Sequence, residues 1–86
     1  LIFSLAIQYL QSAMKKSSEE AVEYLEKIMI KYPNSSVCYD LFDYFEMESN
    51  TRKAIKWLRE SASLDNSDAI YELAKRYYYG DGIRID

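Results

Sequence analysis

Side chains that could support catalysis are scarce in this chain of 86 residues, which contains no histidine and a single cysteine, Cys38. Histidine is the commonest general base and metal ligand, so its absence excludes hydrolytic triads and most transition-metal sites. Cys38 stands between Val37 and Tyr39 without a base in a matching motif, so we interpret it as a buried hydrophobic residue. We therefore expect a protein that is not an enzyme and needs no cofactor or metal.

Two short segments resemble ligand-binding loops but lack the residues that define them. Gly80-Asp-Gly82 has the glycines of a phosphate loop, yet it follows a predicted helix, whereas P-loops and dinucleotide loops follow strands. Asp65-x-Ser67-Asp68 resembles part of a calcium loop without its central glycine and terminal glutamate. We interpret the first segment as the end of a helix and the second as a turn that caps the next helix.

The remaining polar side chains favour binding over catalysis. Acidic residues and then basic residues recur at helical spacing, so each set lies on one face of a helix. These residues are Asp40, Asp43, Glu46, Arg52, Lys56 and Arg59. Two solvated helix faces explain the pattern, and a charged groove is the alternative. The nine tyrosines also suit binding, because a tyrosine ring packs while its hydroxyl stays available for a partner.

The composition predicts one small helical domain. Hydrophobic residues make up 49% of the chain, enough for a packed core, and the 2 glycines and 1 proline are too few for a sheet with frequent turns. The net charge of −3 disfavours nucleic acid as a partner. No apolar run approaches the roughly 20 residues of a membrane-spanning helix, so we expect no membrane insertion by this segment. A soluble protein with a cytoplasmic location is favoured.

Apolar spacing and capping residues predict five helices. Their expected ranges are 2–13, 19–31, 36–48, 51–64 and 69–79. Ser17-x-x-Glu20 has the form of a capping box for the second helix, and Pro33 ends that helix. Asn34 or Ser35 can cap the third helix, and Gly80 can end the fifth in a left-handed conformation. Links this short place successive helices antiparallel.

Segments of the chain recur at a nearly constant interval. Ala21-Val-Glu-Tyr-Leu25 matches Ala54-Ile-Lys-Trp-Leu58, and residues 34–41 match residues 66–73 at almost the same separation. Phe3-x-Leu5-Ala6-x-x-Tyr9 aligns in turn with residues 39–45 and 71–77. The alignment predicts aromatic core residues at Tyr9, Phe45 and Tyr77, and at Tyr24 and Trp57. Stacked helix pairs of this kind form an α-solenoid, whose core would include Leu41 and Leu58.

The clearest pattern is Ala69-x-Tyr71-x-Leu73-Ala74-x-x-Tyr77-x-x-Gly80-x-Gly82-Ile83-x-x-Asp86, preceded by Ala54-x-x-Trp57-x-x-x-x-Ala62. It resembles the Sel1-like repeat family of the tetratricopeptide-like α-solenoid superfamily. The resemblance implies an all-α, right-handed superhelix of antiparallel helix pairs, with about two and a half repeats in a single domain over residues 1–86. These are repeat one (1–34), repeat two (35–67) and a half repeat (68–86). Because the chain begins at Leu1 and ends in a predicted loop, we expect it to be part of a longer protein.

The chain departs from the family pattern in its first half. Repeats one and two lack the Gly-x-Gly loop, and Phe42 stands where the family has a small residue. Both departures bring this half closer to a plain tetratricopeptide.

The resemblance also predicts where a partner binds. In tetratricopeptide-like stacks the first helix of each pair lines the concave side, and repeat-equivalent residues form columns across it. The predicted columns are Phe3, Tyr39 and Tyr71; Ile7, Asp43 and Lys75; and Leu10, Glu46 and Tyr78. From these columns we expect a partner-binding set of Tyr39, Asp43, Glu46, Tyr71, Lys75 and Tyr78.

The resemblance implies a non-catalytic scaffold or adaptor that binds a peptide or a protein subunit in the concave groove. The alternative is a structural repeat segment, or a regulatory appendage of an enzyme or a ribonucleoprotein complex, in which the basic fourth helix contacts RNA. Self-association is a further option, because the fifth helix has no pairing partner here and exposes its apolar face.

Overall fold

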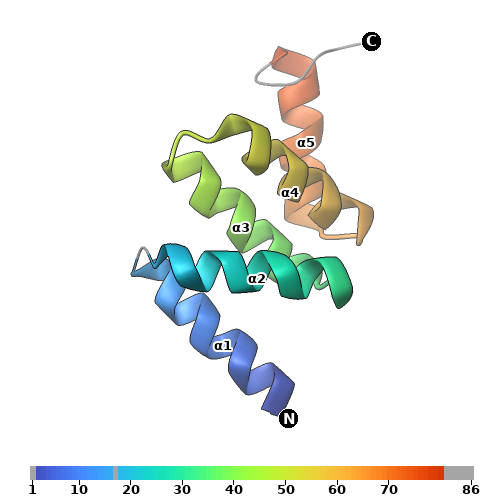
Figure 1. The fold of residues 1–86 in the computed structure, drawn as a ribbon. Helices are drawn as coiled ribbons and strands as arrows, with labels where there is room; N and C mark the ends of the chain where they lie inside the picture. The colour runs from blue at the N-terminus through green and yellow to red at the C-terminus, as the bar shows by residue number, and fades with distance from the viewer. Residues whose placement is uncertain (1, 17, 81–86) are drawn as a thin grey trace.

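Five helices account for nearly all of the described chain. The computed structural model describes residues 2–16 and 18–80, with side chains from residue 4 onward. The helices are α1 (Ile2–Lys15), α2 (Glu19–Lys31), α3 (Ser35–Met47), α4 (Thr51–Ser63) and α5 (Ser67–Tyr79). No strand occurs among these residues, and each helix folds back along the one before it, from α1 at one end of the stack to α5 at the other (Figure 1). The predicted all-α helical solenoid is confirmed.

The starts of four helices are evenly spaced along the chain. Ser18, Asn34, Asn50 and Asn66 are the N-caps of α2 to α5, and each side-chain oxygen accepts a hydrogen bond from the backbone N–H three residues later, over 2.9 to 3.2 Å. Each helix with its short link therefore forms one half of a repeat. Such a cap stabilises its helix by about 1 kcal/mol. The capping prediction at Asn34 is confirmed, whereas Ser17 lies outside the described residues and Ser18 caps α2.

The helices end in tight reversals. Gly80 ends α5 with φ at 67°, the left-handed conformation predicted for it. Ser49 and Asp65, which follow α3 and α4, adopt similar angles of 59° and 66° although they carry side chains. A left-handed conformation costs such residues about 1 kcal/mol. These reversals are short, which keeps consecutive helices in contact along their length.

The core lies where α2, α3 and α4 meet. Leu25, Leu41 and Leu58 are fully buried there, and α3 packs against α4 along most of its length. The burial of both Leu25 and Leu58 confirms the alignment of α2 with α4, because the two leucines hold the same place in their helices. Two polar groups enter this core with partners: the Trp57 Nε1–H donates to Glu26 at 3.3 Å, and the Ser61 hydroxyl donates to a backbone carbonyl of α3 at 2.7 Å.

The register predicted for α1 is wrong. Leu5 and Tyr9 are 51% and 69% exposed, whereas Met14 is 4% exposed and belongs to the same core cluster as Phe45. Met14, and not Tyr9, therefore takes the place in α1 that Phe45 takes in α3. The core-facing stripe of α1 consists of Ile7, Leu10 and Met14. Its spacing of three and then four positions is that of one helix face, so the sequence allowed this register as well as the predicted one.

Three of the five aromatic residues predicted for the core lie at the surface. Phe45 and Trp57 are buried, but Tyr9, Tyr24 and Tyr77 are 69%, 52% and 38% exposed. Trp57 of α4 is covered from the side of α2, and no described helix covers Tyr24 of α2 in the same way. Tyr77 likewise lacks the cover that α4 gives to Phe45. Equivalent positions are buried only where a neighbouring helix supplies the opposing surface.

Candidate interaction surface

The predicted partner-binding residues come from α3 and α5, and contacts between side chains join these two helices. The Arg76 guanidinium of α5 donates to both carboxylate oxygens of Glu46 on α3 and lies 5.2 Å from the centre of the Phe42 ring. Arg76 was not among the predicted residues, although its position four residues after Glu72 is typical of an ion pair on a helix. Arg76 therefore fixes α5 against α3 by both charge and ring contact.

A second ion pair lies beside the first. The Lys75 ammonium is 2.9 Å from Glu72 Oε1, and the Arg76 Nε is 3.6 Å from Glu72 Oε2. The hydrogen bond with Glu72, followed by its charge, raises the pKa of Lys75. Two of the predicted residues, Glu46 and Lys75, are thus already engaged with partners inside the chain.

The tyrosines of the predicted set differ in exposure. Tyr39 is half-buried, with its ring 5.3 Å from that of Phe42. Burial and then the negative charges of Asp43 and of Glu72 raise the pKa of the Tyr39 phenol, so Tyr39 faces α5 closely enough to sense its charges. Tyr71 and Tyr78 are 67% and 81% exposed on α5. Both rings are therefore available to a partner.

Tyr71 and Tyr78 have different neighbours. The Lys75 ammonium lies 5.3 Å from the centre of the Tyr71 ring, which links Tyr71 to the ion pairs between α3 and α5. Tyr78 packs edge-on against Tyr79 at 4.9 Å, and within residues 4–16 and 18–80 no contact ties it to α3. The junction of the two helices thus contains Tyr39, Asp43, Glu46, Tyr71 and Lys75, with Tyr78 further along α5.

Asp43 differs from Glu46 and Glu72 at this junction, because no cation among the described residues is bound to its carboxylate. Burial raises the pKa of its carboxyl, and the negative charges of Asp40, Glu72 and Glu46 raise it further. No hydrogen bond or ion pair to Asp43 occurs in the described part of the chain. The carboxylate is therefore held in a field that favours an approaching positive charge.

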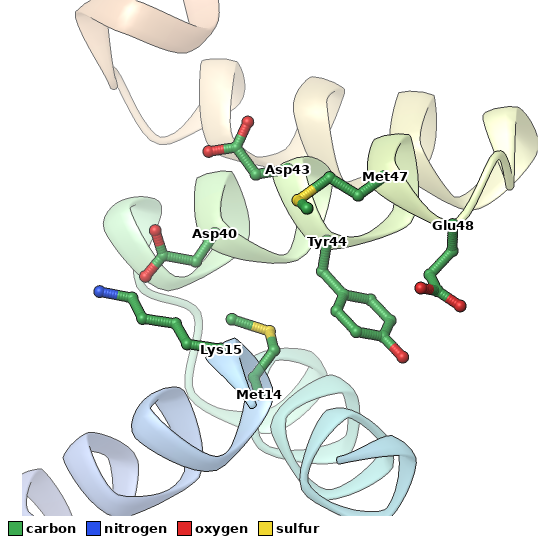
Figure 2. A pocket seen from close by; sticks show the side chains of 7 residues that line it. All are labelled: Met14, Lys15, Asp40, Asp43, Tyr44, Met47 and Glu48. Carbon is green, nitrogen blue, oxygen red and sulfur yellow. The ribbon is translucent and has the colours of Figure 1, made fainter. Parts of the chain in front are cut away.

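A pocket of about 260 Å³ lies between the end of α1 and α3 (Figure 2). Its lining residues are Met14, Lys15, Asp40, Asp43, Tyr44, Met47 and Glu48. At its edge, the Gln11 amide donates to Asp40 at 2.7 Å and ties α1 to α3.

The pocket shows that α1 was misplaced in the predicted columns. Ile7 and Leu10 were expected beside Asp43 and Glu46, but they pack against the core, and the last turn of α1 lies at this place instead. The side chain of Phe3 lies outside the described residues. The pocket was not predicted, because it depends on the register of α1 against α3, two helices that are distant in sequence.

Three basic side chains of α4 contact other groups of the chain, whereas Arg52 of the predicted basic face is exposed. Lys53 pairs with Glu26 at 3.3 Å, Lys56 lies 4.8 Å from the centre of the Trp57 ring, and Arg59 donates to the Tyr77 hydroxyl at 3.4 Å. A second pocket of about 300 Å³ opens between α2 and α3, and four glutamates and Lys53 contribute to its lining. Its largely acidic lining disfavours a phosphate backbone on this side too.

The other candidate chemistry has a structural explanation. Cys38 is fully buried, and burial raises the pKa of its thiol to about 11, so it is protonated at neutral pH and unreactive as a nucleophile. Over the described ranges, no three acidic, cysteine or histidine residues are placed to hold a metal ion. No described helix is both long and apolar enough to cross a bilayer.

Comparisons with known proteins gave one match. The family model described as Sel1 repeat matches residues 3–28, 37–66 and 67–86, which together cover most of the chain. No curated protein and no solved structure matched.

Proposed function

Since the chain belongs to the Sel1 repeat family, whose repeats are generally modules of protein–protein interaction, we propose that it is a non-catalytic adaptor. It binds a peptide or a protein subunit on the surface of α3 and α5. We call this the α3–α5 surface and define it by Tyr39, Asp43, Glu46, Tyr71, Lys75 and Tyr78. A shared surface on the first helices of successive repeats is what a solenoid offers to an extended partner.

The observation that carries this proposal is a pair of exposed tyrosines on α5, a helix that an ion pair fixes against α3. Tyr71 and Tyr78 are 67% and 81% exposed, while Arg76 fixes their helix to Glu46 of α3. Large aromatic side chains dominate the binding energy of many interfaces, and a rigid support lowers the entropy lost when they engage. Charged groups around them would orient the partner and speed its association.

A pair of matched variants tests the proposal. A partner is first captured with the wild-type chain, and its affinity is then measured for Tyr71→Ala and Tyr24→Ala. Both tyrosines are exposed and both have a lysine over the ring, Lys75 at 5.3 Å and Lys27 at 5.7 Å, but Tyr24 lies on α2. Tyr71→Ala should weaken binding by about 1–3 kcal/mol and Tyr24→Ala should not.

The opposite pattern contradicts this surface. If Tyr71→Ala, Asp43→Lys and Tyr78→Ala all leave partner binding intact, whereas changes at Lys56 and Arg59 abolish it, the working surface is that of α4. The alternative role in a ribonucleoprotein would then return, and a steep fall in affinity with salt would identify phosphate contacts. The engagement of α4 cations with carboxylate, ring and hydroxyl groups of the same chain favours the adaptor.

A further inference from the structure

The pocket between α1 and α3 has the size of a side-chain site. Its volume of about 260 Å³ falls below the roughly 300–1,000 Å³ that is usual for sites of small-molecule ligands. It is open to the surface, and its lining comes from the last turn of α1, from the part of α3 between residues 40 and 47 and from Glu48, which follows α3 (Figure 2). A pocket of this kind suits one or two side chains of a bound segment better than a separate ligand.

Thioether and aromatic groups form the apolar walls of the pocket. Met14 lies on the α1 side and is buried, whereas Met47 lies on the α3 side and is 84% exposed, with Tyr44 beside it (Figure 2). Methionine is unbranched and polarizable, so it adapts to apolar side chains of different shape. An exposed methionine next to a buried one gives an incoming apolar group a surface to contact on both sides.

The charge around these walls is negative. Asp40, Asp43 and Glu48 contribute carboxylates and Lys15 one ammonium, so the lining carries a net charge of −2 at neutral pH. Asp40 accepts a hydrogen bond from Gln11, which is neutral and leaves the charge in place. Burial, and then the same crowding of negative charge, raises the pKa of Asp43.

At the neighbouring junction of α3 and α5, by contrast, the carboxylates have cations bound to them. Glu46 and Glu72 are balanced there by Arg76 and Lys75, within 4 Å. On this side of α3, as far as the structure describes it, negative charge without a bound cation is therefore concentrated at the pocket. Electrostatic complementarity calls for a positive group in the occupant.

We propose that this pocket receives a lysine or arginine side chain of a bound protein segment, together with the apolar side chain next to it. The apolar group lies between Met14 and Met47, and the cation lies against Asp40 and Asp43. The inference rests on the proposed adaptor function and names the chemistry of its partner, a basic and apolar peptide segment.

The three methionines of the chain provide the readout. With ¹³C-labelled methionine methyl groups, Met14 and Met47 report on the pocket, and Met29, which is 2% exposed in the core, serves as an internal control. The probes are two capped peptides that differ only at the centre, Leu-Arg-Leu and Leu-Glu-Leu, titrated into the millimolar range. Leu-Arg-Leu should shift the signals of Met14 and Met47 but not of Met29, and Leu-Glu-Leu should shift none of them.

A charge-matched pair of variants tests the role of the carboxylates. The double variant Asp40→Asn and Asp43→Asn should weaken binding of Leu-Arg-Leu at least about fivefold, since two charge contacts are lost. Glu20→Gln with Glu60→Gln removes the same charge from exposed positions of α2 and α4, outside the pocket, and should leave the affinity within about twofold.

The outcomes separate this inference from the proposed function. Equal shifts with both peptides, or unmoved Met14 and Met47 signals with Leu-Arg-Leu, overturn the inference. If a captured partner still depends on Tyr71 in that case, the adaptor function stands. If Leu-Arg-Leu binds at the pocket while no partner responds to Tyr71→Ala, the pocket stands and the proposed α3–α5 surface fails.

Discussion

α3 and α5 hold the same position in successive repeats, yet they lie in different surroundings. Leu41 and Phe45 of α3 are 0% and 6% exposed because α4 covers them, whereas the equivalent Leu73 and Tyr77 of α5 are partly exposed. Among the described helices, none covers α5 on that side (Figure 1). Residues at equivalent positions of two repeats therefore contribute unequally to stability when a helix covers one of them and not the other.

Charged residues at equivalent positions of α3 and α5 also have different surroundings. Asp43 and Lys75 hold equivalent places in α3 and α5, but Asp43 lies among other carboxylates and Lys75 lies against Glu72. Burial and neighbouring carboxylates therefore disfavour the charged form of Asp43, whereas Glu72 favours the charged form of Lys75. The three predictions below measure these differences, beginning with the largest.

Truncation of equivalent leucines should give very different losses of stability. Leu41→Ala, and Leu58→Ala in the same core, should each lower the free energy of unfolding by about 2–5 kcal/mol, because a fully covered site cannot collapse around the cavity. Leu73→Ala should cost about 1 kcal/mol, since part of its side chain already meets water. Urea denaturation of the three variants gives the values.

Equal losses at Leu41 and Leu73 would contradict the comparison. They would indicate that another molecule covers α5 in solution, such as a second copy of the chain. The melting temperature would then rise with protein concentration, which a dilution series detects.

Arg76→Ala should release α5 from α3 at a cost of about 1–3 kcal/mol, the usual range for a partly buried, charge-assisted contact. Hydrogen exchange should quicken throughout α5 and remain slow in α3. Lys75→Gln, the adjacent and more exposed position, is the control and should leave exchange in α5 almost unchanged. A loss of protection spread evenly over α3 and α4 would show that Arg76 supports the whole core.

Asp43→Asn should raise stability at neutral pH by a few tenths of a kcal/mol, a small effect because the side chain is only partly buried and solvent screens its charge. The pKa of Asp43 is raised in the folded state, so its ionisation opposes folding above that pKa. The difference between wild type and variant should disappear as the pH falls below about 4, where both side chains are neutral. Urea denaturation at pH 7 and pH 3.5 measures it.

A stabilising effect of Asn that persists unchanged at pH 3.5 would show that charge is not its cause. If Asp43→Asn raises stability and the double variant also binds the peptide more weakly, then Asp43 lowers the stability of the fold while it contributes to binding. A residue that destabilises its own helix but serves a partner is what a binding surface predicts.

Much of the fold was predictable because its signals are local. The predicted helix at 19–31 matches α2, the other helices differ by one or two residues at one or both ends, and the caps at Asn34 and Gly80 were identified. The predicted equivalence of α2 and α4 also appears in the buried Leu25 and Leu58. The binding residues remain a prediction, since no partner tests them.

The errors concern contacts between repeats. Tyr9 was assigned to the core because it matched Phe45 in type, whereas packing depends on the place along the helix, and Met14 holds that place. Arg76 and the pocket were missed because their partners, Glu46 and α1, are distant in sequence.

The sequence by itself determined where each helix begins and ends. Helical hydrogen bonds and capping bonds join residues within a single turn, so Ser18, Asn34, Asn50 and Asn66 set the even spacing of the helices without reference to the rest of the chain. Only the tertiary structure decided the register of α1 against α3, the burial of Phe45 but not Tyr77, and the pairing of Arg76 with Glu46. Those outcomes depend on which surface lies opposite each side chain, and another helix, of the same repeat or of the next one, supplies that surface.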